Sequence, residues 1–404
     1  MEPSNNLVEV PAIRVVKANF GSKHIKQQAA SSVLTRLPAS NDPILRLNGL
    51  CPYYTMFPVQ FPFRILKDAD RNDWVLDPFC GRGTTLYAAR LRGLPSVGID
   101  SNPVAAAIAA SKVINVRPDN IISLADEILS EKSIPDDVPR GRFWRSCYNG
   151  KTLKDICRLR EYLLTKCSTK SEIGLRGIIL GILHGPKRKG LPTYLSNQMP
   201  RTYATKPQPA IKYWYRHNEK PAYVDVLDAI TRRVCFVYSH IPDPAPGVVY
   251  QSDSRYQDVK SQGYRFKWVI SSPPYYGMRS YWPDQWLRNW FLGGPSDVEY
   301  NHSGQISHKC PEEFVTSVAE VWRRSAEACV PGARMVIRFG AIPSSFHDPG
   351  ALLKQTLYEA DCGWRILTIQ SAGKASRGKR QSEQFNATVR DPIDEIDLYA
   401  RLEV

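Results

Sequence analysis

The stretch Val75-Leu76-Asp77-Pro78-Phe79-Cys80-Gly81-Arg82-Gly83-Thr84-Thr85 joins an apolar run to two glycines and a helix-forming segment. It predicts a strand, a glycine turn and a helix, because glycine permits positive φ and lets the backbone pass close to a ligand. Free N–H groups at such a helix start attract an anionic group. A similar turn occurs in any doubly wound fold, and it also occurs in dinucleotide-binding sites. Leu86 stands where the dinucleotide fingerprint has its third glycine, which disfavours the dinucleotide interpretation.

The residues around this stretch alternate between strand and helix patterns. Strands are expected over 74–76 and 95–99, and helices over 84–92 and 103–113. Such alternation predicts an α/β fold with a parallel, doubly wound sheet. Asp100 closes the second strand nineteen residues after Gly81, a separation that suits an acid contacting a ribose hydroxyl.

A second motif, Ser272-Pro273-Pro274-Tyr275, directly follows a strand expected over 268–271. Consecutive prolines fix the backbone, so that the Ser272 hydroxyl and the Pro273 carbonyl are held as hydrogen-bond acceptors. Acceptors of this kind can hold an aromatic amine in line for attack on a methyl group, and Tyr275 offers a ring for stacking a base. A proline-rich turn after a strand is common by itself. Its place after a glycine-turn strand favours a catalytic role.

Together the two motifs resemble those of the S-adenosylmethionine-dependent amino-group DNA methyltransferases. The resemblance implies a Rossmann-like class I methyltransferase sheet and S-adenosyl-L-methionine as the cofactor. It implies that Asp77, Gly81, Gly83 and Thr84 surround the methionine part and that Asp100 meets the ribose. The full cofactor-binding set expected from it is Tyr54, Phe57, Asp77, Pro78, Phe79, Gly81, Gly83, Thr84, Thr85, Asp100, Ser101, Asn102 and Asp253. The expected catalytic residues are Ser272, Pro273, Pro274 and Tyr275.

The leading serine of the second motif resembles the cytosine-N4 group of this family, whereas adenine-N6 enzymes mostly carry Asp or Asn there. Methylation at cytosine C5 needs a cysteine nucleophile, typically in a Pro-Cys pair, and this chain contains no Pro-Cys dipeptide. We therefore expect transfer to the N4 amine of a cytosine flipped out of the duplex. The alternatives are an N6-adenine enzyme, an RNA base amine methyltransferase and a DNA-binding homologue without activity.

The charge of the chain is unevenly distributed. The formal net charge is +15, and residues 141–220 hold 17 Lys and Arg against four Asp and Glu. A basic, aromatic-bearing segment of this kind is typical of contact with a polyanion, although a solvated charged face is the simpler alternative. The expected DNA-binding residues are Lys187, Arg188, Lys189, Asn197, Gln198, Arg201, Tyr203, Arg279, Lys374, Arg377 and Arg380. The expected partner is double-stranded DNA, with a cognate restriction nuclease if the enzyme serves a restriction-modification system.

The expected organisation is a split catalytic domain. Residues 46–115 and 246–404 form the sheet, 116–245 is an inserted DNA-recognition region, and 1–45 is an N-terminal extension. Within the insert, helices are expected over 118–131, 151–184 and 223–240. The remaining strands of the sheet are expected over 247–250, 334–339 and 364–369, and the last of these is expected to be its final strand. A helix is expected over 312–329.

Several classes of protein are disfavoured by the composition. The nine cysteines include no Cys-x-x-Cys pair, so neither a zinc site nor a disulfide framework is expected, and no metal is assigned. Neither a signal peptide nor a run long enough for a membrane span is apparent, which predicts a cytoplasmic protein. Trp286 and Trp290 are expected to pack in the core rather than to contact a base.

Overall fold

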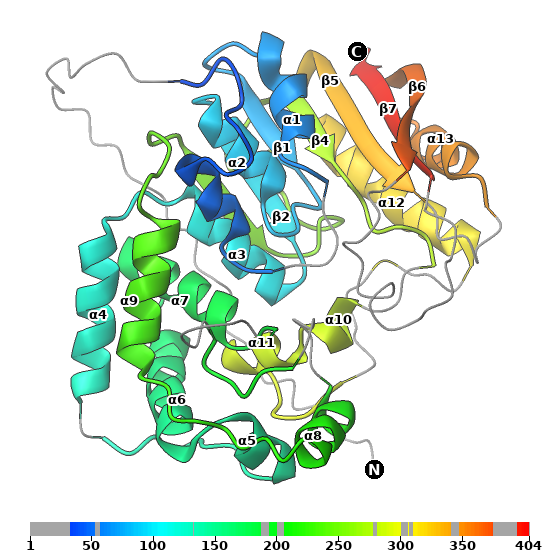
Figure 1. Ribbon diagram of the computed structural model, residues 1–404. Helices are drawn as coiled ribbons and strands as arrows, with labels where there is room; N and C mark the ends of the chain where they lie inside the picture. The colour runs from blue at the N-terminus through cyan, green and yellow to red at the C-terminus, as the bar shows by residue number, and fades with distance from the viewer. Residues whose placement is uncertain are drawn as a thin grey trace, which may run out of the picture.

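The computed structural model describes residues 33–52, 57–131, 133–186, 194–199, 206–277, 281–299, 306, 310–340, 347–374 and 394–403. Within them, one sheet is covered by helices on both faces, and a group of helices lies to one side of it (Figure 1). The strands are β1 (Trp74–Asp77), β2 (Ser96–Asp100), β3 (Gly247–Gln251), β4 (Phe266–Ser271), β5 (Cys329–Gly340), β6 (Trp364–Lys374) and β7 (Asp394–Leu402). Their order is β3-β2-β1-β4-β5-β7-β6. Strands β1 to β5 pair in parallel, whereas β7 runs antiparallel to both neighbours. The expected doubly wound α/β fold is confirmed.

The two faces of the sheet bury alternate residues of its strands, as the period of a strand requires. One face carries α1 (Gln60–Ile65), α2 (Thr84–Leu91) and α3 (Pro103–Val113). The other carries α12 (Pro311–Glu327) and α13 (Pro349–Ala360). Val75 of β1 therefore packs with Phe61 of α1, while its neighbour Leu76 packs in the cluster that contains Phe314 of α12.

The described part of residues 116–245 forms helices and contributes no strand to the sheet, since the edge strand β3 begins only at Gly247. These helices are α4 (Pro118–Ser130), α5 (Arg142–Cys147), α6 (Gly150–Thr165), α7 (Lys170–Ile182), α8 (Pro207–Arg216) and α9 (Val226–Val237). They pack against α2, α3 and α11 (Trp286–Phe291) in one hydrophobic cluster, and they occupy the lower part of Figure 1. The short helix α10 (Tyr281–Asp284) precedes α11. Trp286 and Trp290 are 3% and 1% exposed, which confirms their expected place in the core.

The segment before β1 is more ordered than its prolines suggest. Residues 50–63 contain three prolines, yet α1 forms there and includes the last of them, Pro62. Pro62 lies in the first turn of α1, where proline is tolerated because that N–H has no intrahelical partner. The 3-10 helices η1 (Pro43–Gly49) and η2 (Leu66–Asp68) flank it. Leu34 N donates to the Leu91 carbonyl over 3.1 Å, so the described end of the expected N-terminal extension packs on α2.

Three further boundaries differ from expectation. Residues 151–184 do not form one helix, because Thr169 and Glu172 form a capping box that starts α7 after α6 has ended. The strand expected over 334–339 is longer, because β5 begins at Cys329 and includes Pro331 and Gly332. The strand over 364–369 is not the last one, because β7 inserts between β5 and β6. In the part of the chain that the structure describes, no helix has the length and apolar character of a membrane span.

Candidate active site

The candidate site lies where the strand order reverses. From β1, the chain continues to β2 on one side of the sheet, while β4 pairs with β1 on the other side. In a doubly wound sheet, ligands bind outside the carboxyl ends of the strands at such a switch point. The glycine turn follows the carboxyl end of β1, and Ser272-Pro273-Pro274-Tyr275 follows that of β4. The topology therefore brings the two motifs to the same edge of two hydrogen-bonded strands.

A hydrogen bond joins the first motif to the residue that directly precedes the second. Ser271 Oγ donates to Asp77 Oδ1 across 2.6 Å, and both side chains are buried. Phe79 N donates to the same carboxylate oxygen over 3.2 Å. Burial raises the pKa of Asp77 to about 6, against the lowering effect of these donors. Asp77 thus fixes the start of its own turn and the end of β4.

The turn itself needs its glycines. Gly81 and Gly83 have φ values of +51° and +76°, and Gly83 precedes the first residue of α2. A Cβ on Gly83 would lie 2.9 Å from Ala109 Cβ, so glycine there also permits the close packing of α2 on α3. A Cβ on Gly81 would meet nothing within 4 Å among the described atoms, which leaves space on that side of the turn.

Asp100, at the end of β2, is tied to the same turn. Its Oδ2 accepts from Gly81 N and its Oδ1 from Asn102 N, each over 2.8 Å. Burial raises the pKa of Asp100 to about 6, although both backbone donors lower it. Asn102 in turn caps α3 by accepting from Val104 N over 2.9 Å. The expected ribose acid and the expected glycine turn are therefore one hydrogen-bonded unit.

The buried polar atoms of the turn fit a polar ligand. Thr84 Oγ1 is buried and has no hydrogen-bond partner among the described residues, and Thr84 opens α2. An orphan hydroxyl beside a helix N-terminus suits a carboxylate, such as that of a methionine moiety. Thr85 Oγ1 instead lies 3.4 Å from the Ile270 carbonyl and links α2 to β4. Pro78 and Phe79 line the first half of the turn, and Phe79 packs edge-on against Trp322.

Other expected cofactor residues take less direct positions. Phe57 is half-buried and packs edge-on against Phe61, with ring centroids 5.3 Å apart. Ser101 is exposed between Asp100 and Asn102. Asp253 forms an ion pair with Arg255, in which both carboxylate oxygens accept from the guanidinium. The turn after β3 is held near the site by its neighbour Ser254, whose hydroxyl donates to the Pro78 carbonyl.

The second motif presents its groups at the carboxyl end of β4. Ser272, Pro274 and Tyr275 are half-buried, while Pro273 is buried. Ser272 is thus partly accessible at the end of β4, where a donor can reach its hydroxyl oxygen. Tyr275 Oη donates to Glu395 Oε1 of β7 over 2.8 Å, and the ring packs edge-on against Phe339 of β5.

Sequence reasoning missed three residues of this site. Ser271 and Glu395 make the contacts just described. Arg82, 6% exposed, donates from Nη1 to the Cys51 carbonyl over 3.3 Å and so joins the glycine turn to the segment before Phe57. Burial lowers the pKa of Arg82 to about 10. Its position between the two glycines was the available indication, since a charged residue there must find partners.

The expected DNA-binding residues are only partly described. Asn197 Nδ2 donates to the Ser146 carbonyl over 3.2 Å, so one amide donor is already engaged within the protein. The Gln198 carbonyl accepts from Trp214 Nε1 over 3.4 Å, which ties this segment to α8. The expected site residues that lie outside the described residues are Tyr54, Lys187, Arg188, Lys189, Arg201, Tyr203, Arg279, Arg377, Arg380 and the side chain of Lys374.

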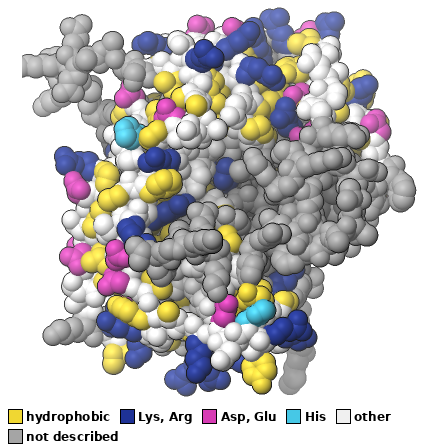
Figure 2. All heavy atoms as spheres, viewed as in Figure 1, with side chains coloured by type: hydrophobic (Ala, Val, Ile, Leu, Met, Phe, Trp, Pro, Cys, Tyr) yellow, Lys and Arg dark blue, Asp and Glu magenta, His cyan; other side chains and the backbone are white. Residues whose placement is uncertain are grey.

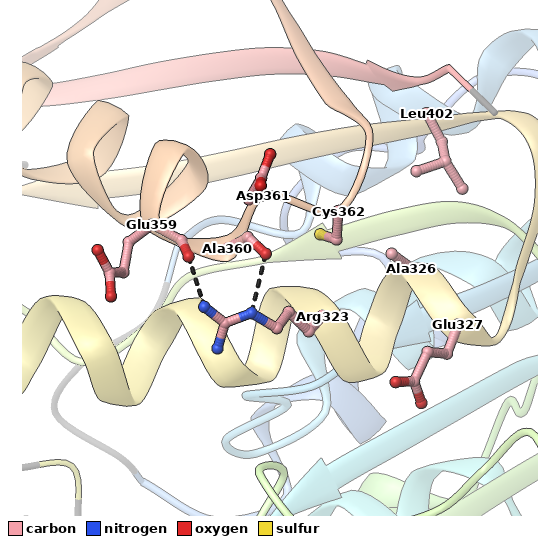
Figure 3. A pocket seen from close by; sticks show the side chains of 8 residues that line it. All are labelled: Arg323, Ala326, Glu327, Glu359, Ala360, Asp361, Cys362 and Leu402. Carbon is pink, nitrogen blue, oxygen red and sulfur yellow. Dashed lines mark hydrogen bonds between the residues drawn. The ribbon is translucent and has the colours of Figure 1, made fainter.

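A separate hollow of about 610 Å³ lies at the opposite edge of the sheet, where β6 begins and β7 ends (Figure 3). Arg323 of α12 reaches across it and donates to the Glu359 and Ala360 carbonyls at the end of α13. Cations near the last carbonyls of a helix stabilise that end of it. The hollow lies away from the strand ends that carry the two motifs, and its arginine has a structural role.

Comparison with known proteins agrees with this geometry. Residues 25–111, which contain the glycine turn and Asp100, match the profile of the N6/N4 methyltransferase family, described as DNA methylase. No curated protein matches the chain. The strand order with an antiparallel β7 agrees with the class I S-adenosylmethionine-dependent methyltransferase sheet that the sequence motifs imply, and S-adenosylmethionine is the cofactor that the matching family implies.

Several solved structures are similar to this chain at low sequence identity and with TM-scores below 0.5. An rRNA methyltransferase, aviRa from Streptomyces viridochromogenes, is 12% identical with a TM-score of 0.32, and the alignment covers 87% of each chain. An S-adenosylmethionine-dependent methyltransferase from Methanosarcina mazei is 10% identical with a TM-score of 0.31, over 86% of this chain and 99% of the other. A protein from Thermus thermophilus assigned as a DNA modification methylase is 19% identical with a TM-score of 0.22, over 38% of this chain and 51% of the other.

Proposed function

We propose that this chain, whose residues 25–111 match the N6/N4 DNA methylase family, methylates the exocyclic N4 amine of a flipped cytosine in duplex DNA. The hydrogen bond between Ser271 and Asp77 carries the proposal, because it joins the end of β4 to the glycine turn. A methyl donor held at that turn and an amine held at Ser272 would then share one edge of the sheet. Both are needed at one place for direct transfer.

The residues of the site divide the work between cofactor and base. S-adenosylmethionine, when bound, supplies an electrophilic methyl group on a sulfonium centre. The turn from Gly81 to Thr84 would hold its methionine part and Asp100 its ribose. Asp77 would keep the turn in place through Ser271 and Phe79, rather than through contact with the cofactor, because its side chain is 1% exposed.

The catalytic corner would act on the amine. The amine nitrogen of cytosine is a poor nucleophile because its lone pair is delocalised into the ring. The Ser272 hydroxyl and the Pro273 carbonyl would accept its two N–H bonds and aim the lone pair at the methyl group. The methyl group would pass from the sulfonium sulfur to the nitrogen, which would leave the cofactor as a neutral thioether, and the amine would then lose one proton to solvent. Tyr275 would stack on the flipped base.

The choice of cytosine N4 depends on Ser272, since a leading serine resembles the N4 enzymes. The physical role of an acceptor suits an adenine N6 amine as well, and amines of RNA bases have the same chemistry. An inactive DNA-binding homologue is disfavoured because Gly81, Gly83, Ser272 and Tyr275 are all present. Membership in a restriction-modification system, with a cognate nuclease, would follow only from a site-specific activity.

The test is nucleoside mass spectrometry. Purified protein is incubated with isotopically labelled S-adenosylmethionine and with unmethylated duplex DNA or structured RNA. Labelled N4-methylcytosine from DNA is the expected product, and Ser272→Ala should abolish it while leaving cofactor binding by calorimetry unchanged. Label found only in N6-methyladenine would overturn the choice of base, and label only in RNA would overturn the choice of substrate. Cofactor binding without product in either polymer would favour the inactive homologue.

A further inference from the structure

The charge of the helical region, residues 116–245, is polarised along it. Residues 117–131, which contain α4, carry Asp119, Asp126, Glu127 and Glu131 against Arg117 alone. At the other end, α5 and the residue before its N-cap carry Arg140, Arg142 and Arg145 with no acid, and residues 206–220 carry Lys206, Lys212, Arg216 and Lys220 against Glu219. α5 and α8 thus carry four cations and no acid, whereas the four cations of α6, Lys151, Lys154, Arg158 and Arg160, are interspersed with Asp155 and Glu161.

The side chains at this end are interleaved with an aromatic ring. Arg142, Arg145, Lys212 and Arg216 are exposed to solvent, and these four residues define what we call the α5/α8 surface. Tyr215, on the same surface, is 79% exposed, and the Arg142 guanidinium carbon lies 5.9 Å from its ring centroid. Figure 2 shows Lys and Arg side chains gathered at the lower end of the molecule, where Figure 1 places α5 and α8.

The α5/α8 surface is rigidly joined to the segment that follows the catalytic corner. Beneath it, Phe143 of α5 packs on Trp286 of α11 with ring centroids 5.1 Å apart and on Trp214 of α8 at 5.9 Å. Trp144 packs on Trp290 at 4.5 Å. These buried aromatic contacts connect α5 and α8 to α11, so the surface cannot shift independently of that helix.

An ion pair adds a second connection near the site. Lys206, the residue that precedes α8, lies 3.6 Å from Asp284 Oδ1 in α10, nine positions after Tyr275. From Lys206, the ten residues of α8 extend about 15 Å towards Arg216. One strand of B-DNA presents a phosphate about every 3.4 Å along its axis, so a helix of this length lies beside roughly four phosphates.

We propose that the α5/α8 surface binds the phosphate backbone of duplex DNA and fixes the duplex relative to Ser272 and Tyr275. This inference rests on the proposed function, which supplies DNA as the substrate. Lys212 and Arg216 contact phosphates without reading sequence, and Tyr215 covers the sugar-phosphate surface between them. Contacts of this kind position the duplex and leave base recognition to other residues.

The test measures binding of a fluorescently labelled duplex of mixed sequence by anisotropy over a range of salt concentrations. Each phosphate contact contributes about 0.9 to the slope of log affinity against log salt, so Lys212→Gln with Arg216→Gln should lower the slope by about 2. The matched control replaces Arg71 and Lys354, exposed cations before β1 and on α13, with Gln. It removes the same charge and should leave the slope unchanged. Circular dichroism checks that both variants fold.

Methyl transfer separates failure of this surface from failure of the proposed function. The variant with Lys212→Gln and Arg216→Gln, here the α5/α8 variant, should have a several-fold higher KM for DNA. Its kcat at saturating DNA should be unchanged, because the catalytic corner is intact. An unchanged slope in a protein that still methylates DNA would overturn the surface alone. A wild-type protein that neither binds nor methylates DNA would overturn both proposals. Tighter binding of a structured RNA, lost in the α5/α8 variant, would replace duplex DNA by RNA as the ligand of this surface.

Discussion

Ser271 and Asp77 lie 194 positions apart in the chain, and their side chains meet across a 2.6 Å hydrogen bond at the ends of β4 and β1. Ser271→Ala removes the donor and leaves a buried carboxylate with one partner fewer. At pH 8, where Asp77 is ionised, we expect this to lower the free energy of unfolding by about 1–3 kcal/mol. Urea denaturation of both proteins measures the difference.

The effect of Ser271→Ala should depend on pH. The folded-state pKa of Asp77 is raised to about 6 from an ordinary value near 3.8, so its ionisation costs stability as pH rises through this window. The Ser271 hydroxyl offsets part of that cost, and a protonated Asp77 needs it less. The loss should therefore be smaller at pH 5 than at pH 8. Ser111→Ala is the control, because Ser111 is buried and donates to the neutral carbonyls of Ala107 and Ile173. A loss of equal size at both pH values would contradict the role of Asp77.

Cofactor affinity should follow the ionisation of Asp100. Burial raises its pKa to about 6, and only the ionised carboxylate accepts hydrogen bonds from both ribose hydroxyls. The affinity for S-adenosylmethionine is therefore lost as pH falls through 6, with a dissociation constant roughly tenfold higher at pH 5 than at pH 7. Isothermal titration calorimetry between these values measures it.

Two variants identify which carboxyl group causes this pH dependence. Asp100→Asn should bind the cofactor weakly with no inflection near pH 6, because its amide does not titrate. Asp77 titrates in the same range but is buried behind the turn, so Asp77→Asn should keep the inflection. If Asp77→Asn alone removed it, the contact with the ribose would have to be reassigned.

The fold was largely predictable from local features. Gly81, Gly83 and Asp100 mark the ends of β1 and β2, because the left-handed turn and the acid at a strand end are local requirements. The errors lie where a local feature was overlooked. Thr169 and Glu172 form a recognisable capping box between α6 and α7. Ile396, Leu398, Ala400 and Leu402 alternate as a strand should, yet β7 was not expected.

The site was less predictable, because its decisive contacts join distant residues. The sequence shows Ser271 as the end of a strand. Its hydrogen-bond partner Asp77 can be identified only once β4 is known to lie beside β1. Glu395 is 120 positions from Tyr275 and meets it because β7 enters the sheet next to β5. Asp253 and Arg255 are close in sequence. Whether the Asp253 carboxylate binds a ligand or the neighbouring guanidinium depends on side-chain geometry, which the sequence does not give.

Gly83→Ala tests the turn itself. The alanine must adopt φ near +76° with its Cβ 2.9 Å from Ala109 Cβ. The left-handed conformation and the overpacking together should lower the free energy of unfolding by about 3 kcal/mol. Urea denaturation measures this loss. Gly150→Ala is the control, since a Cβ there meets nothing within 4 Å and its φ is not positive. Gly150→Ala should change stability by less than about 1 kcal/mol, and an equally mild Gly83→Ala would show that the turn can relax.

Substitutions of Tyr275 and Glu395 test whether β7 positions the ring that is proposed to stack on the base. Tyr275→Phe keeps the ring and Glu395→Ala removes the acceptor, so each loses the same 2.8 Å hydrogen bond. Each should lower kcat about five- to tenfold, the equivalent of one hydrogen bond, and the double variant should be no slower than either single one. Glu395→Gln keeps an acceptor oxygen and should restore kcat to within about twofold of wild type. Multiplicative losses would show that Glu395 acts independently of Tyr275, because residues that share one contact can lose it only once.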